Sequence, residues 1–359
     1  MRVIFRRLLA AVFVVLAIPG TALADLKVSS WNLMHLGWGD EKNYQEVADI
    51  MQRFDIIAVQ EVMSESALHK VVDTLNATTH DHWRYLASHA IGRGSYKELY
   101  GIIYRTEAVE YESGAVVYID SRDVFAREPF SARFHNKRDG GSFALATVHI
   151  LYGKSEADRA PEIKALASYW QWLQETYGGV PVMLMGDFNF APDSTAFSAL
   201  RRVGAAPTIT SGKSTLSPHN GRFASLYDNI WVTPGRLTLG EHGIVNYPKL
   251  LGIDHVTARK TVSDHAPVYV VLKDTNAGAA PTQKPAAAAA PVTSGQRDCI
   301  DLNQSSAQRL ADLPHIGVKR AELIVAGRPW QSVGELVRIR GIGEKSAHDI
   351  AAYSGLCAQ

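Results

Sequence analysis

A polar pair directly after a short apolar run carries residue types that phosphate chemistry uses. Residues 182–185 are all apolar, and Asp187 and Asn189 follow them after a glycine. The run predicts a strand buried on both faces, and polar residues spaced by two positions point to the same side of an extended chain. Carboxylate and amide oxygens are the ligands that Mg²⁺ prefers in proteins. Taken alone, the stretch could equally be a Gly–Asp turn that ends a strand.

Further oxygen donors lie beside apolar runs elsewhere in the chain. Asn32 ends the strand predicted at 26–31, Glu61 follows the apolar strand predicted at 55–59, and Asp264 precedes the apolar run at 268–272. Each has a plain structural alternative, because an asparagine can cap a turn and a glutamate can begin a helix. Together with the first pair they predict a site that holds a divalent metal ion and a phosphate group.

Two histidines accompany these donors. His149 ends an apolar run, and His265 belongs to a Ser-Asp-His stretch. Histidine suits proton transfer because its ordinary pKa lies near neutrality. Such a histidine needs a carboxylate that fixes its tautomer and orientation, and Glu98 and Asp228 are available for this role.

The elements that must position these residues alternate between strands and helices over residues 25–273. This alternation predicts an α/β fold of two sheets, with the polar residues gathered at one edge. Strands are predicted over 26–31, 55–59, 99–104, 116–119, 130–134, 143–149, 182–185, 226–232 and 268–272, and helices over 43–53, 64–75 and 162–176.

The bulk composition is that of a globular protein with a large domain and a small one. The chain has 359 residues, 46% of them hydrophobic and 20% charged, which excludes a disordered or fibrous class. Its formal net charge is +1. Any binding of nucleic acid must therefore come from local patches and backbone donors.

Residues 1–24 have the pattern of a secretory signal peptide. Three arginines precede a short apolar stretch, and small residues at 22 and 24 provide a cleavage site. The stretch is shorter than the ~20 residues that a membrane-spanning helix needs, which disfavours the alternative of a membrane anchor. We predict cleavage after Ala24 and a protein in the periplasm or the medium, without a membrane attachment.

A second domain is predicted after an alanine- and proline-rich linker at 274–296. Within 297–359, residues 310–321 parallel 336–347, and each segment predicts a helix, a hairpin ending in Ile-Gly, and a second helix. Cys299 and Cys357 bracket this domain. In an exported protein the two cysteines are expected to form a disulfide bond, the alternative being two free thiols.

The catalytic segments resemble the endonuclease/exonuclease/phosphatase superfamily, and in particular its deoxyribonuclease I-like branch. The resemblance implies a four-layer α/β sandwich (deoxyribonuclease I-like) and Mg²⁺-dependent cleavage of DNA. It covers about 250 residues and is carried by motifs in the family's order: Trp31-Asn32, Gln60-Glu61, Arg93 to Glu98, Arg127-Glu128-Pro129, Thr147-x-His149, Gly186-Asp187-Phe188-Asn189, Tyr227-Asp228-x-Ile230 and Ser263-Asp264-His265.

The resemblance also implies a role for each motif residue. Glu61 would be the principal metal ligand, supported by Asn32 and Asp264. Asp187 and Asn189 would position the scissile phosphate or a metal. The acid and the base would be His149 and His265, backed by Glu98 and Asp228 respectively, and the DNA contacts would be Arg93, Tyr96 and Arg127. Methionines occupy positions 34 and 63, where the family relative has arginines that contact DNA. Mn²⁺ could replace Mg²⁺, and a Ca²⁺ requirement stays open.

The C-terminal segment resembles tandem helix-hairpin-helix motifs of the ComEA type. Such modules hold DNA phosphates through backbone N–H groups without reading sequence. The resemblance assigns DNA binding to Gly317 of the first hairpin and to Gly341, Gly343 and Lys345 of the second. His315 stands where the first hairpin would have its first glycine. A compact helical module that docks a protein is the alternative.

The sequence as a whole therefore predicts a secreted, metal-dependent deoxyribonuclease held on double-stranded DNA by a small α-helical domain. A monomer is favoured. Two alternatives stay open: a secreted phospholipid phosphodiesterase of the same superfamily, and a DNA-binding or uptake protein with an inactive nuclease domain. The phospholipid alternative would need an exposed aromatic hairpin that enters a membrane, and it gives no reason for a DNA-binding domain.

Overall fold

The computed structural model describes residues 25–39, 41–219, 221–273 and 300–356, the last range without 304, 306, 312, 329, 354 and 355. The chain divides into two compact units, Met1–Ala280 and Pro281–Gln359. The predicted signal peptide, the predicted linker, Cys299 and Cys357 lie outside the described residues. Within the described residues, no helix is long and apolar enough to span a bilayer.

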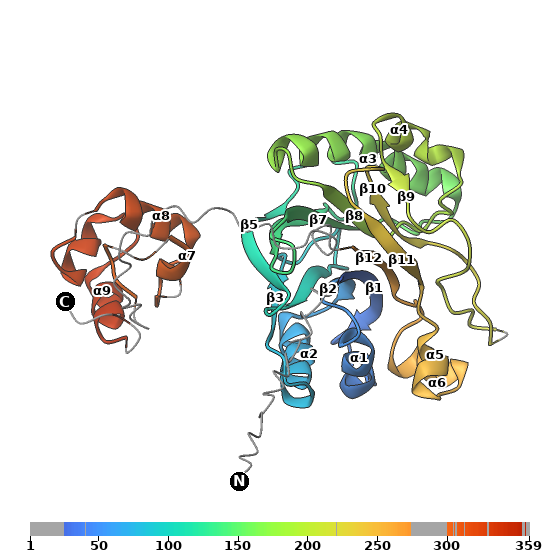
Figure 1. Ribbon diagram of the computed structural model, residues 1–359, viewed down its shortest axis with the longest axis horizontal. Helices are drawn as coiled ribbons and strands as arrows, with labels where there is room; N and C mark the ends of the chain where they lie inside the picture. The colour runs from blue at the N-terminus through green and yellow to red at the C-terminus, as the bar shows by residue number, and fades with distance from the viewer. Residues whose placement is uncertain are drawn as a thin grey trace, which may run out of the picture. The chain divides into compact units, whose positions relative to one another are not determined.

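Two six-stranded sheets form the centre of the first unit (Figure 1). The first sheet has the order β11-β12-β1-β2-β4-β3 and the second β5-β6-β7-β8-β10-β9. Both sheets are mixed, because β1 runs parallel to β2 and β7 parallel to β8, whereas the other neighbours are antiparallel. The strands are β1 (Leu26–Leu36), β2 (Ile56–Val62), β3 (Trp83–Ala87), β4 (Leu99–Arg105), β5 (Val109–Val117), β6 (Phe130–Asn136), β7 (Ser142–His149), β8 (Val182–Asp187), β9 (Ala206–Pro207), β10 (Asp228–Val232), β11 (Leu239–Ile244) and β12 (Val268–Leu272).

Helices cover the two outer faces, so the unit has the four layers that the sequence predicts. Figure 1 shows α1 and α2 on one side of the sheets and α3 and α4 on the other. The 21-residue helix α3 begins at Glu156, earlier than predicted, because Ser155 and Asp158 form a capping box. The helices of this unit are α1 (Tyr44–Met51), α2 (Glu65–Thr78), α3 (Glu156–Thr176), η1 (Thr195–Phe197), α4 (Ser198–Arg202), α5 (Tyr247–Leu251) and α6 (His255–Thr261).

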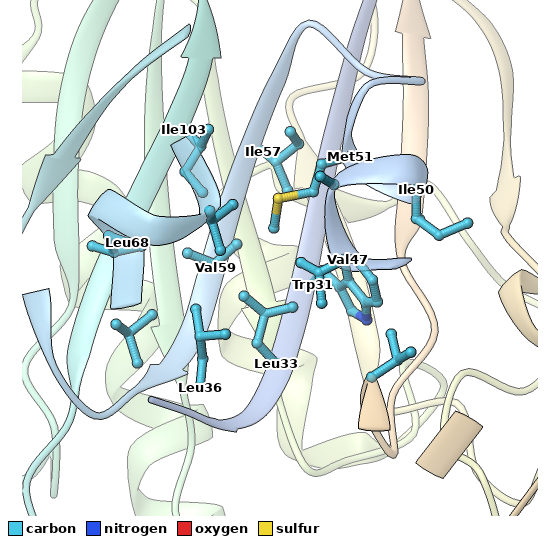
Figure 2. Packing of buried hydrophobic residues seen from close by; sticks show 14 of the residues in the cluster. Trp31, Leu33, Leu36, Val47, Ile50, Met51, Ile57, Val59, Leu68 and Ile103 are labelled. Carbon is cyan, nitrogen blue, oxygen red and sulfur yellow. The ribbon is translucent and has the colours of Figure 1, made fainter. Parts of the chain in front are cut away.

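Three buried apolar clusters hold the layers together, one at each interface. Strand β2 contributes to two of these clusters, because successive side chains of a strand point to opposite faces of the sheet. Ile57 and Val59 pack toward α1 and α2, as Figure 2 shows, whereas Ile56 and Ala58 pack between the two sheets. The third cluster joins the second sheet to α3 and includes Trp170. Burying one such large side chain contributes about 1.5–3 kcal/mol, so the clusters fix the sheets against each other.

The described residues of the second unit form helices and one isolated β-bridge, between Ile300 and Leu356. Its elements are α7 (Ala307–Leu310), α8 (Val318–Ala326), η2 (Val333–Arg338) and α9 (Glu344–Ala351). A small core that includes Leu310, Ile324, Leu336 and Ile350 joins them. The two Ile-Gly hairpins precede α8 and α9, as the repeat in the sequence predicts.

Candidate active site

Strand register in the second sheet places three predicted site residues in one row. Asp187 ends β8 and is the register partner of His149 on β7 and of Asp228 on β10. Residues paired in this way have their side chains on the same face of the sheet. All three are buried, with exposed fractions of 6% or less. The buried apolar start of β8 therefore serves to hold a carboxylate between a histidine and a second carboxylate.

The first sheet brings Asn32 and Glu61 to the same edge from β1 and β2. Glu61 lies where the pairing of β2 with β4 shifts register, and its φ of 56° is unusual for a residue with a side chain. Such irregularities redirect a side chain and are common at functional sites. The Asn32 amide Nδ2 donates to Glu61 Oε1 at 2.9 Å and to Asp187 Oδ2 at 3.1 Å, so it links the two sheets.

Each histidine is held by a carboxylate from the opposite sheet. His149, on the second sheet, donates from Nδ1 to Glu98 Oε1 at 2.7 Å, and Glu98 directly precedes β4 of the first sheet. His265, which precedes β12 of the first sheet, donates from Nδ1 to Asp228 Oδ2 at 2.8 Å on the second. These bonds fix the rings and leave both Nε2 atoms available for proton transfer. The two predicted pairs are therefore present.

Both Nε2 atoms face one common point, the Asp187 carboxylate. The distance to Asp187 Oδ2 is 3.7 Å from His149 Nε2 and 3.5 Å from His265 Nε2. Glu61 Oε1 lies 3.8 Å from His149 Nε2, and Asp264 Oδ1 lies 3.9 Å from His265 Nε2. The predicted proton carriers and the predicted oxygen donors thus form one cluster.

Charge and burial shift the pKa values of this cluster. Burial and the Arg127 charge oppose protonation of His149, but Glu98 and Asp187 outweigh them and raise its pKa. Burial likewise opposes protonation of His265, and Asp228 and Asp187 raise its pKa well above the ordinary value. Burial, aided by the Asp228 charge, raises the pKa of Asp187 despite the two histidines. Such perturbed groups are typical of catalytic sites.

The backbone at the end of β8 approaches its neighbour strand more closely than any residue but glycine permits. Gly186 has a φ of +143°, and a Cβ there would lie 1.9 Å from the carbonyl oxygen of Val148. Asn189, with a φ of 49°, is held by two hydrogen bonds: its N–H donates to Asp187 Oδ1 and its Nδ2 donates to the Ile150 carbonyl, at 2.9 and 2.8 Å. The Gly-Asp-Phe-Asn stretch is therefore a shaped turn and not a plain strand end.

The oxygen donors fit a hard divalent cation. Glu61 and Asp264 are carboxylates with side chains 14% and 23% exposed, and each has an oxygen close to a histidine Nε2, at 3.8 and 3.9 Å. Asp264 also forms an ion pair with Arg259, whose Nη2 lies 3.1 Å from Asp264 Oδ2. In the observed orientation Asn32 presents its NH₂ group to the carboxylates, while its Oδ1 accepts from Met34 N, so ligation by Asn32 requires the amide to turn over. A separate group, Asp187, Asp228 and His265, has ligand atoms within 4.8 Å of one another and could also hold a divalent ion.

The three predicted DNA contacts of this unit have different surroundings. Arg93 is exposed and forms an ion pair with Asp123 at 3.0 Å. Tyr96 is half-buried and donates from its hydroxyl to Glu98 Oε2 at 3.3 Å. Arg127 is buried, and its Nε donates to the His149 carbonyl at 3.0 Å. The structure therefore places Arg127 within the histidine network.

In the second unit, the predicted phosphate contacts lie at helix starts. Gly317 and Gly343 are the N-cap residues of α8 and α9, and a Cβ at either position would meet no atom within 4 Å. Lys345 is exposed in the first turn of α9. Gly341 has a φ of 91°, and His315 has a φ of 63° at the corresponding position of the first hairpin. His315 therefore adopts the left-handed conformation of the glycine that it replaces.

Several supporting residues escaped the sequence analysis. The Gln60 amide spans the sheets, donating to Ser30 Oγ at 3.1 Å and to Thr147 Oγ1 at 2.8 Å. Ser263 Oγ donates to the Asn32 carbonyl and accepts from His265 N. Gln60 and Ser263 directly precede Glu61 and Asp264 in their motifs, so a supporting role for them could be predicted from the sequence. Ser214, which accepts from Asp228 N at 3.1 Å, lies far from any motif in sequence.

The fold and the site define a class of protein, and comparisons with known families agree. Residues 29–265 match the Endonuclease/Exonuclease/phosphatase family, and residues 295–353 match the Helix-hairpin-helix motif. The chain therefore belongs to the Endonuclease/Exonuclease/phosphatase family and has a helix-hairpin-helix motif after the family domain. It is an enzyme of the nuclease and phosphodiesterase class.

Particular relatives share most or all of the chain. The protein named Deoxyribonuclease from Thioalkalivibrio sp. (strain K90mix) is 43% identical over 99% of this chain and 99% of its own length. Deoxyribonuclease-1 of Homo sapiens is 32% identical over 74% of this chain and 99% of its own. The structure of an endonuclease/exonuclease/phosphatase family protein from Leptotrichia buccalis has a TM-score of 0.51 and 18% identity, covers 69% of this chain and 99% of that chain, and supports the fold alone.

Proposed function

We propose that this protein is a deoxyribonuclease that hydrolyses DNA phosphodiester bonds with a bound divalent metal, in the first place Mg²⁺, with Mn²⁺ as a substitute. The proposal rests on two histidine–carboxylate pairs, one of His149 with Glu98 and one of His265 with Asp228. The Nε2 atoms of both histidines face Asp187. Two proton carriers on either side of one point suit hydrolysis, which needs a base for water and an acid for the leaving oxygen. The relatives named deoxyribonucleases support DNA as the substrate.

Each residue has a definite task in this proposal. Asp228 orients His265 so that Nε2 of the neutral ring can accept a proton from water, and Glu98 orients His149 so that the protonated ring can donate a proton to the departing oxygen. Asp187 and Asn189 position the scissile phosphate between them. Glu61, Asp264 and Asn32 hold the metal, which would neutralise charge that develops on the phosphate oxygens. Arg127 keeps the His149 backbone in place.

The helix-hairpin-helix unit is proposed to keep the enzyme on DNA without reading sequence. Its exposed helix starts and Lys345 are suited to phosphate oxygens. Tethering a weakly charged catalytic domain to such a unit raises the local concentration of DNA at the active site. A monomer suffices for this arrangement.

The export of the protein and its disulfide bond are proposed from the sequence alone. The leader at 1–24 supports export to the periplasm or the medium. Cys299 and Cys357 are the two cysteines of the chain, and in an exported protein such a pair is expected to form a disulfide bond. Reaction of the unreduced full-length protein with a thiol reagent would contradict that bond.

Plasmid nicking by the mature chain tests the proposed function. With Mg²⁺ the wild type should convert supercoiled plasmid to the nicked form, and EDTA should abolish the conversion. His265→Ala should lower the rate at least about a hundredfold, because one general acid–base group contributes that much. His219→Ala, at an exposed histidine outside the cluster, is the matched control and should cleave at the wild-type rate.

The other outcomes separate the alternatives. DNA binding without cleavage under any divalent metal would replace the nuclease by a DNA-binding or uptake protein. Hydrolysis of sphingomyelin or phosphatidylcholine vesicles, without any cleavage of DNA, would support the phospholipid phosphodiesterase.

A further inference from the structure

An exposed tryptophan beside the active site takes no part in the proposed proton transfer or metal binding. The side chain of Trp38 is 62% exposed, whereas the other six tryptophans of the chain are buried or half-buried. It lies in the turn that follows β1, two residues after the buried Leu36. Single exposed apolar side chains are common on protein surfaces, so the exposure of Trp38 matters only because of where it lies, beside the active site.

The backbone of this turn is built to present the ring. Met34 and His35 have φ values of 44° and 57°, which cost energy in residues with side chains. Gly37, with a φ of +89°, packs so closely on α2 that a Cβ would lie 2.6 Å from the Ala67 Cβ. Trp38 N donates to the His35 carbonyl at 3.0 Å and closes the turn. The turn is thus anchored on α2 at Gly37, and its strained residues, Met34 and His35, precede Trp38.

Three rings from two segments meet at this turn, and we call them the aromatic platform: His35, Trp38 and Tyr96. The His35 and Trp38 rings lie 5.0 Å apart at an interplanar angle of 82°. Tyr96 lies 6.0 Å from the His35 ring and 6.3 Å from the Trp38 ring. In an edge contact the edge of one ring meets the face of its neighbour, so these contacts order the three rings, and the 62% exposure of Trp38 leaves part of its surface open to a ligand.

The aromatic platform is continuous with the catalytic cluster. His35 Nε2 lies 3.3 Å from Glu61 Oε2, and the Tyr96 hydroxyl donates to Glu98 Oε2. Glu61 and Glu98 in turn contact the His149 ring. Whatever occupies the platform is therefore next to the group cleaved at the histidines. None of the residues 33–39 is a lysine, arginine, aspartate or glutamate, so the turn offers ring faces to a ligand and no formal charge to a phosphate.

We propose that the aromatic platform binds an unstacked base of single-stranded nucleic acid, adjacent to the phosphate being cleaved. This inference deepens the proposed function and rests on it. Every base has a π face, but in a duplex neighbouring base pairs cover both faces, so a ring such as Trp38 gains stacking only from an unpaired or extruded base. The platform therefore adds single-stranded DNA, or an opened end of a duplex, to the substrates of this site.

The test compares one sequence as a single-stranded oligonucleotide and as a duplex. Stacking contributes ~1–3 kcal/mol per base, so Trp38→Ala should lower kcat/KM for the single strand by about tenfold and leave the duplex within about twofold. Trp38→Phe keeps a ring face and should retain most of the single-strand activity. Ile119→Ala, at a residue that is 86% exposed, is the control for loss of a surface apolar group and should change neither rate.

The outcomes separate this inference from the proposed function. If the wild type cleaves neither substrate, the proposed function fails. If the wild type cleaves the duplex only, or if Trp38→Ala slows both substrates equally or neither, the platform does not bind an unstacked base. Binding of the wild type to phosphatidylcholine vesicles that Trp38→Ala abolishes, with unchanged single-strand cleavage, would instead make the turn a membrane contact and overturn the inference.

Discussion

At the residue scale, the site depends on carboxylates that define what each histidine can do. Asp228 and Glu98 are buried with exposed fractions of 0%, and each accepts from one Nδ1. A buried carboxylate that pairs with a histidine favours the protonated ring, which is why burial does not lower the pKa of His265. The same pairing makes the protein's stability depend on pH.

The metal-free protein should lose stability as the pH rises above the ordinary histidine value. The folded pKa of His265 is raised, so its contribution is fully present below the unfolded pKa of about 6.5 and is lost as the pH passes through the folded pKa. His149 acts in the same direction. Asp228→Asn removes the main cause of the His265 shift, so its melting temperature should fall less than that of the wild type between pH 6 and pH 9.

Melting curves in EDTA across that pH range provide the measurement. Asp73→Asn, at an exposed position on α2, is the matched control and should follow the wild type. Parallel curves for Asp228→Asn and the wild type would show that the pair does not set the pH dependence.

At the scale of elements, the last residues of β8 decide whether the second sheet can form around the site. The backbone of β8 at Gly186 approaches β7 so closely that a Cβ would overlap the Val148 carbonyl. The clash is with backbone, and backbone yields only if the strands separate. Asp187, the next residue, would move with it.

Gly186→Ala should therefore lower stability by more than about 2 kcal/mol, because it combines overlap with a φ that disfavours side chains. It should also abolish cleavage in whatever protein still folds, since Asp187 would leave the two histidines. Gly178→Ala is the control: a Cβ there would lie 3.9 Å from its nearest neighbour, the Glu175 carbonyl, and its stability should match the wild type. Urea unfolding of the three proteins gives the comparison, and a stable, active Gly186→Ala enzyme would contradict it.

Many of the strands and helices could be predicted from the sequence, because a buried strand appears in it as a run of apolar residues. The runs that end at Asp187 and His149 are β8 and β7, and the helix pattern at 43–53 contains α1. The edge strands β3 and β11 were missed, since their residues are largely half-buried or exposed and lack a continuous apolar run. The pairs His149–Glu98 and His265–Asp228 could be expected from the motifs. The buried state of Arg127 could not, because a single arginine carries no periodic signal that separates a surface from a core position.

At the scale of the whole molecule, the helix-hairpin-helix unit should change affinity for DNA and not the chemistry. Gly317 and Gly343 have φ values of −90° and −92°, which other residues adopt readily, and open space surrounds both. Aspartate is a good N-cap residue, so Gly317→Asp with Gly343→Asp should preserve the helices. It would nevertheless place a carboxylate where a DNA phosphate is proposed to bind.

We expect this double variant of the full chain to bind duplex DNA in EDTA at least about tenfold more weakly, since a hydrogen bond to a charged group is worth ~1.5–3 kcal/mol. Its binding should also depend less on salt, because fewer phosphates are contacted. The double alanine variant at the same positions is the control and should bind nearly as the wild type does. Unchanged affinity in the aspartate variant would remove the hairpins from DNA binding. Fluorescence anisotropy with a labelled duplex makes the measurement.

Each histidine–carboxylate pair joins a residue of one sheet to a residue of the other. This limits how the catalytic domain could be divided into two active pieces. A cut in the turn between β4 and β5 would leave Glu98 on the N-terminal piece, and His149 and the Asp228–His265 pair on the C-terminal piece. Neither piece alone would contain both pairs together with Glu61. Cleavage would return only on reassembly of the sandwich, so the domain is suited to a split reporter that signals when two fused partners meet.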